Sequence, residues 1–160
     1  MNRIFVFLLP LIVFAGCAGV NASAPKSSKS ISMLIKTPKL RINDAGFIHR
    51  YNKFTQVQIY NSGKSVLELK IGEQICINGA CDEPLAFNRK FFGREHYAGL
   101  LEDIISLAPI FGGRDATKTS CGFTQNISEL SLKYAVCGDK ATFEDAKNRV
   151  KIEIKDFKFE

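Results

Sequence analysis

Cysteine is the residue type that could do the most chemistry in this sequence, and its five copies fall into two groups. Cys17 lies near the start of the chain, and the other four are Cys76, Cys81, Cys121 and Cys137. An even set of cysteines in an exported chain indicates disulfide bonds, because exported proteins fold in an oxidising compartment. The four later cysteines therefore predict two disulfides.

The sequence between the cysteines favours one of the three pairings that four cysteines allow. An Asn-Gly dipeptide lies between Cys76 and Cys81, and this dipeptide is typical of a two-residue β-hairpin turn. A turn there brings these two cysteines close together, which leaves Cys121 to pair with Cys137 across two later strands. Reduced, buried thiols are the alternative.

The other reactive residues do not combine into a site. His49 and His96 do not stand at zinc-finger spacing from the cysteines, and the chain has no CxxC motif. His96 could form a nucleophile pair with Cys76 or Cys81, but a disulfide between those cysteines is the more economical interpretation. The adjacent acids at 102–103 would point about 100° apart on a helix, which indicates a solvated face. We therefore predict no catalytic residue, no metal ligand and no cofactor, and a protein that is not an enzyme.

Residues 1–17 have the pattern of a targeting segment. Arg3 gives the start a positive charge, and residues 4–14 are apolar apart from Pro10. This length is typical of a secretory signal peptide and is too short for a stable helix across a bilayer. The run FAGC at 14–17 resembles the lipobox of bacterial lipoproteins, with Phe14 where leucine is usual.

The resemblance implies a protein held on a membrane by lipid. The thiol of Cys17 would receive a diacylglyceryl group, the signal peptide at 1–16 would be removed, and the new amine would carry an acyl chain such as palmitate. Two or more acyl chains anchor a protein stably. Ala18 and Gly19 do not match the aspartate that retains lipoproteins in the inner membrane, so the implied location is the outer membrane. The alternatives are a secretory signal with an incidental cysteine and an uncleaved membrane helix.

The rest of the chain divides into a tether and one domain. Residues 17–30 are mostly small and polar, which predicts a flexible tether after the lipidated cysteine. Residues 31–160 are enough for a single β-rich globular domain. The formal net charge is +6 at pH 7, but the basic residues are scattered, which indicates a solvated surface rather than a nucleic-acid site. Attraction to anionic lipid or lipopolysaccharide is the other use for such a charge.

Alternating apolar residues predict a mainly antiparallel sheet. Residues 54–60 and 67–71 flank turn residues and predict a β-hairpin. A turn at 44–46 is predicted to separate two early strands from the next one. The other predicted strands lie at 32–37, 39–43, 47–51, 75–81, 119–127, 130–136 and 150–154, whereas 141–148 is ambiguous between a helical turn and a loop.

Two helices are predicted in the middle of the chain. Residues 85–92 place Phe87 and Phe91 one helical turn apart, and residues 94–108 show an apolar face that ends before Pro109. The predicted fold class is therefore α+β. It consists of a mainly antiparallel sheet or a sandwich, with a two-helix insertion at about 83–108 that covers one side of the sheet.

Residues 75–111, ICINGACDEPLAFNRKFFGREHYAGLLEDIISLAPIF, resemble uncharacterised lipoproteins of Campylobacter- and Helicobacter-type bacteria. The resemblance implies a compartment only, because no catalytic residue comes with it. We therefore expect a lipid-anchored outer-membrane lipoprotein on the periplasmic face, a non-enzymatic binding or scaffolding component of the cell envelope. Its expected partners are the membrane and an envelope protein, and not nucleic acid. The alternatives are a surface-exposed lipoprotein that contacts host or neighbouring cells, and a carrier or enzyme for an envelope lipid or glycan.

Overall fold

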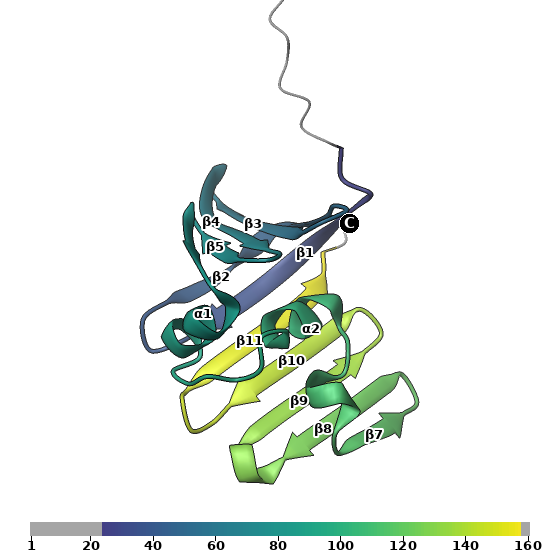
Figure 1. The fold of residues 1–160 in the computed structure, drawn as a ribbon. Helices are drawn as coiled ribbons and strands as arrows, with labels where there is room; N and C mark the ends of the chain where they lie inside the picture. The colour runs from purple at the N-terminus through teal and green to yellow at the C-terminus, as the bar shows by residue number, and fades with distance from the viewer. Residues whose placement is uncertain (1–23, 158–160) are drawn as a thin grey trace, which may run out of the picture.

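The computed structural model describes residues 24–157 and has an α+β fold (Figure 1). The predicted signal peptide and the lipidation site at Cys17 lie outside these residues. The strands are β1 (Ser27–Lys36), β2 (Arg41–Arg50), β3 (Thr55–Asn61), β4 (Lys64–Ile71), β5 (Ile75–Ile77), β6 (Ala80–Asp82), β7 (Ala116–Thr119), β8 (Gly122–Ile127), β9 (Leu132–Cys137), β10 (Lys140–Asp145) and β11 (Val150–Asp156). The helices are α1 (Pro84–Phe91), α2 (Leu100–Ser106) and the short 3-10 helices η1 (Ile110–Gly113) and η2 (Ser128–Leu130).

One antiparallel sheet contains all eleven of these strands, in the order β6-β5-β4-β3-β2-β1-β11-β10-β9-β8-β7. The first six strands form one meander and the last five form another. The two meanders meet at the centre, where β1 pairs with β11. In the sequence, the helical segment connects β6 to β7, which are the two edge strands of the sheet. Because the strands form one continuous ladder, the sandwich that the sequence also allowed is not confirmed.

The alternating apolar residues place the core on one face of the sheet. Ile31, Met33 and Ile35 of β1 are almost fully buried, and β9, β10 and β11 show the same alternation. Both helices lie over one face of the sheet (Figure 1). Helix α2 buries an apolar cluster there: Leu100, Leu101, Ile104 and Ile105. Within residues 24–157, no helix has the length and apolar composition needed to cross a bilayer.

The start of the domain differs from the prediction in two ways. Strand β1 begins at Ser27, so the last four residues that we assigned to the tether belong to the sheet. The predicted turn at 44–46 is wrong, because β2 runs unbroken through these residues. A side chain at Gly46 would place its Cβ only 2.0 Å from the backbone oxygen of Gln58 on β3. The glycine thus permits a close approach of two strands, a role that glycine has inside sheets as well as in turns.

The second predicted helix is also shorter than expected. Residues 94–99 are not helical, and α2 begins at Leu100. Within this segment, the backbone carbonyl of Tyr97 accepts a hydrogen bond from the side chain of Asn88 at 2.8 Å, and the side chain of His96 is buried. Contacts with the rest of the fold therefore override the helical periodicity of the sequence, as tertiary context commonly does.

The hairpin of β3 and β4 is confirmed, with its turn at Ser62 and Gly63 in the left-handed conformation that such turns require. The predicted strand at 119–127 is present as β8, but it begins only at Gly122, because β7 ends at Thr119 and a turn separates the two strands. The ambiguous segment at 141–148 contains most of β10 and the turn that leads into β11.

Candidate functional site

Both predicted disulfides are present. Cys76 and Cys81 face one another across β5 and β6 and form the first, with the Asn-Gly turn between them in the expected left-handed conformation. Cys121 precedes β8 and bonds with Cys137 at the end of β9. Two hairpins of the sheet are therefore covalently closed.

The other residues that we considered for chemistry each have a different partner and do not form one site. His49 forms a hydrogen bond with the hydroxyl of Ser28 at 2.8 Å, and His96 is buried against Asp145. Asp103 accepts a hydrogen bond of 2.6 Å from the hydroxyl of Tyr97. Among residues 24–157, no group of three or more His, Cys, Asp or Glu side chains is placed to hold a metal ion.

A basic surface that the sequence did not predict lies at one end of the sheet. Two adjoining depressions of about 460 and 280 Å³ share Thr37, Pro38 and Arg149 in their walls. Together we call them the basic groove. It lies between the β1–β2 turn, the β10–β11 turn and the end of α1. The cationic side chains that line it are Lys36, Lys39, Arg89, Lys90, Lys147, Arg149 and Lys151.

Three of these cations are neutralised by carboxylates. Arg89 pairs with Glu95, Lys90 lies 2.5 Å from Asp82, and Lys151 contacts glutamates on β10 and β11. The other four form no ion pair within the part of the chain that the structure describes: Lys36, Lys39, Lys147 and Arg149. The groove therefore has an excess of positive charge that the protein does not itself compensate.

The β1–β2 turn is held rigid by a threonine. The hydroxyl oxygen of Thr37 accepts hydrogen bonds from the backbone N–H groups of Lys39 and Leu40, at 3.1 and 3.0 Å. The backbone N–H of Thr37 donates to the carbonyl of Leu40 at 2.8 Å, and Pro38 fixes its own φ angle. The turn therefore presents Lys36 and Lys39 from a defined backbone.

The β10–β11 turn is held by Asp145, whose side chain is fully buried. Its carboxylate accepts hydrogen bonds from the backbone N–H of Asn148 at 2.9 Å and from the side-chain amide of Asn148 at 2.7 Å. Arg149 follows with φ of 58°, a left-handed conformation that is uncommon for a residue with a side chain. Backbone strain of this kind is found preferentially at functional positions.

His96 joins the helical segment to the same turn. Its Nε2 lies 3.5 Å from the Asp145 carboxylate, and the ring contacts Phe92 and Phe111 edge-on. Burial lowers the pKa of His96 and the charge of Arg94 lowers it further, whereas Asp145 raises it. The imidazole is therefore mainly neutral at pH 7. His96 thus packs against the turn, but its Nε2 has no hydrogen-bond partner among the described residues.

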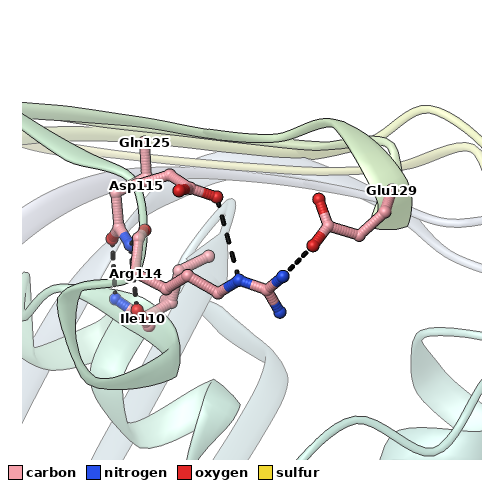
Figure 2. A network of polar contacts seen from close by, with 5 residues as sticks. All are labelled: Ile110, Arg114, Asp115, Gln125 and Glu129. Carbon is pink, nitrogen blue, oxygen red and sulfur yellow. Dashed lines mark hydrogen bonds and ion pairs between the residues drawn. The ribbon is translucent and has the colours of Figure 1, made fainter.

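A polar network with a buried part at Gln125 and an exposed part at Arg114 lies near the other edge of the sheet (Figure 2). The side chain of Gln125 accepts a hydrogen bond from the backbone N–H of Ile110 and donates to the carbonyls of Ile110 and Arg114, at 2.8, 2.9 and 2.6 Å. The guanidinium of Arg114 pairs with Glu129 and lies 3.8 Å from Asp115. Every contact in this network is internal, so it fastens η1 to β8.

The basic groove gives only a weak signal in the sequence. Its four unpaired cations come from residues 36–39 and 147–149, which are more than a hundred positions apart. They meet because Lys36 pairs with Lys151 in the register of β1 and β11. The signal that could have found them is a pair of lysine-bearing turns, and it becomes a site only once the pairing of these two strands is known.

No protein-family model matches this sequence, and no curated protein matches it either. Its function must therefore be inferred from its residues and their geometry.

Proposed function

We propose that this chain is an outer-membrane lipoprotein, anchored by acyl chains on Cys17, whose domain is a non-enzymatic binding or scaffolding part of the cell envelope. The pattern of residues 1–17 supports the anchor, and the two disulfides suit an oxidising compartment. The domain lies on the periplasmic face in this proposal.

The position of the basic groove relative to the start of the domain supports a binding role. The chain leads into the domain at Ser27, at the start of β1, and the basic groove lies at the other end of this ten-residue strand. A strand of that length spans about 33 Å. The C-terminal end of β11 pairs with β1 at Ile31, and the groove lies next to Lys36 at the other end of this ladder, so the start of the domain and the groove are at opposite ends of β1 (Figure 1). An anchored chain would thus hold its groove away from the membrane.

Intact mass of the protein purified from its native membrane tests the anchor. We expect a polypeptide that begins at Cys17 and carries acyl chains, and that gains two hydrogens per disulfide on reduction. A Cys17→Ser variant should be recovered without acyl chains. An unacylated wild-type protein, cleaved elsewhere or not at all, would overturn the proposal.

Protease treatment of intact cells tests the face of the membrane. A periplasmic domain is shielded until the outer membrane is permeabilised. Digestion of the domain in intact cells would instead support the surface-exposed alternative.

A further inference from the structure

We infer that the basic groove binds the cell-wall glycan, a hydrated polymer whose peptide side chains carry free carboxylates. This inference rests on the proposed function, since it names the partner of the anchored domain. The observation that carries it is the set of unpaired cations at the end of the domain that lies farthest from the anchored end.

The charge of the groove favours an anionic ligand. Lys36, Lys39, Lys147 and Arg149 converge on one groove and have no carboxylate partner among residues 24–157. Four like charges held close together repel one another, and an anionic ligand relieves that repulsion. Arg149 lines both depressions and can bind a carboxylate through two parallel hydrogen bonds.

The shape of the groove favours an extended ligand. The two depressions adjoin along Thr37, Pro38 and Arg149, so the cations that line them surround one continuous groove. An anionic chain with repeated carboxylates could contact both depressions at once, and the gain from two linked contacts exceeds that of either alone. A single small anion would use only one of them.

The composition of the groove disfavours a membrane as the partner. Proteins that bind bilayers through their surface combine basic residues with apolar side chains that enter the lipid. The exposed large apolar residues of the described chain are Phe47, Val66, Leu85 and Phe157, and none lines the groove. The cations of the groove suit a polyanion, and its walls hold no large, exposed apolar side chain that could enter a bilayer.

The rigidity of both turns favours binding as well. Thr37 fixes the turn that carries Lys36 and Lys39, and Asp145 fixes the turn that carries Arg149. A preorganised site loses less conformational freedom when its ligand binds.

The location of the groove also favours this partner. In the proposed arrangement, a domain anchored in the outer membrane presents its far end to the cell wall.

Sedimentation with isolated cell-wall sacculi tests the inference. The full-length protein in detergent would be mixed with sacculi, and separately with phosphatidylglycerol vesicles, at low and physiological salt. The groove variant would combine Lys36→Gln, Lys39→Gln, Lys147→Gln and Arg149→Asn, since asparagine tolerates a left-handed backbone. The control variant would lose the same charge elsewhere, through Lys53→Gln, Lys64→Gln, Lys118→Gln and Lys133→Gln.

We expect the wild-type protein to sediment with sacculi and its affinity to fall as salt rises, because salt screens these charges. The groove variant should bind about tenfold more weakly, and the control variant should lose less than about twofold. Equal losses in both variants would show that net charge alone drives binding and would overturn the inference. Because the acyl chains insert every variant into vesicles alike, only vesicle binding that falls in the groove variant, together with no binding to sacculi, would overturn it in favour of a lipid surface. Circular dichroism would confirm that both variants fold.

The two proposals fail separately. An acylated wild-type protein that does not bind sacculi would leave the lipoprotein proposal standing and remove the glycan site. A protein that binds sacculi through the groove but carries no acyl chain would do the reverse.

Discussion

The half-buried Tyr97 and the fully buried Tyr134 differ in what their hydroxyl groups contact. The hydroxyl of Tyr97 donates to Asp103 at 2.6 Å and accepts from the backbone N–H of Phe111 at 3.2 Å. The hydroxyl of Tyr134 is buried without a hydrogen-bond partner among the described residues. Burial raises the pKa of both groups, so both stay protonated at neutral pH.

This difference predicts that a Tyr→Phe substitution changes the free energy of unfolding more at Tyr97 than at Tyr134. Tyr97→Phe leaves the N–H of Phe111 and the carboxylate of Asp103 without their partner, and should lower the free energy of unfolding by roughly 1–3 kcal/mol. Tyr134→Phe removes a buried hydroxyl that bonds to no protein group, and should change the free energy by less than about 1 kcal/mol. Urea unfolding of the two variants checks this. A larger loss in Tyr134→Phe than in Tyr97→Phe would contradict it.

The lowered pKa of His96 should make the free energy of unfolding depend on pH. Burial, and then the charge of Arg94, lower the pKa of this imidazole below its ordinary value of 6.5, more than Asp145 raises it. Below that value the unfolded chain binds a proton that the folded chain does not, so the free energy of unfolding should fall as the pH drops below about 6.5. The fall should stop once the pH passes the lowered pKa of the folded state.

A His96→Gln variant removes this titration. Its free energy of unfolding, measured by urea denaturation between pH 5 and 7, should fall less steeply on acidification than that of the wild-type protein. Equal slopes for the two proteins would mean that His96 titrates alike in the folded and unfolded states.

At the scale of the elements, glycine decides whether two strands can lie close together. Gly46→Ala would place a methyl group 2.0 Å from the backbone oxygen of Gln58, so β2 and β3 would have to move apart. We expect a loss of roughly 1–3 kcal/mol in the free energy of unfolding. Gly63→Asn is the matched control, because its turn position has open space and asparagine tolerates its left-handed backbone. A comparable loss in both variants would show that the close approach is not the cause.

Gly46 also shows where sequence patterns reach their limit. Local signals were sufficient for the hairpin of β3 and β4 and for the Cys76–Cys81 disulfide, because a Ser-Gly or Asn-Gly turn determines its own neighbours. The Cys121–Cys137 disulfide then followed by elimination. The sequence Asp-Ala-Gly at 44–46 is equally typical of a turn, and only the position of β3 makes it part of a strand. The α+β class was therefore predictable, and the bounds of β2 were not.

The same distinction applies to α2 and to the basic groove. Residues 94–99 have a helical apolar period, but the hydrogen bond from Asn88 to Tyr97 and the burial of His96 hold them in another conformation. The cations of the groove are brought together by the pairing of β1 with β11, which links the two ends of the described chain. Long-range pairing of this kind leaves no periodic trace in the sequence.

At the scale of the whole molecule, β1 occupies the centre of the sheet. It pairs with β2 on one side and with β11 on the other, along most of its length. The first meander cannot join the second until β11 is complete, so the last strand of the chain is needed to close the fold. Topologies with such distant pairings fold slowly, because a long loop must close before the contacts that stabilise it can form.

The position of β1 also has a mechanical consequence. A force applied between Ser27 and the basic groove acts lengthwise along β1, with a neighbouring strand hydrogen-bonded on each side. Tension in that direction loads the backbone hydrogen bonds of both ladders together instead of peeling them apart one at a time. The domain is therefore arranged to transmit a pull between its two ends without unravelling, which the proposed link between a membrane and a fixed layer would require.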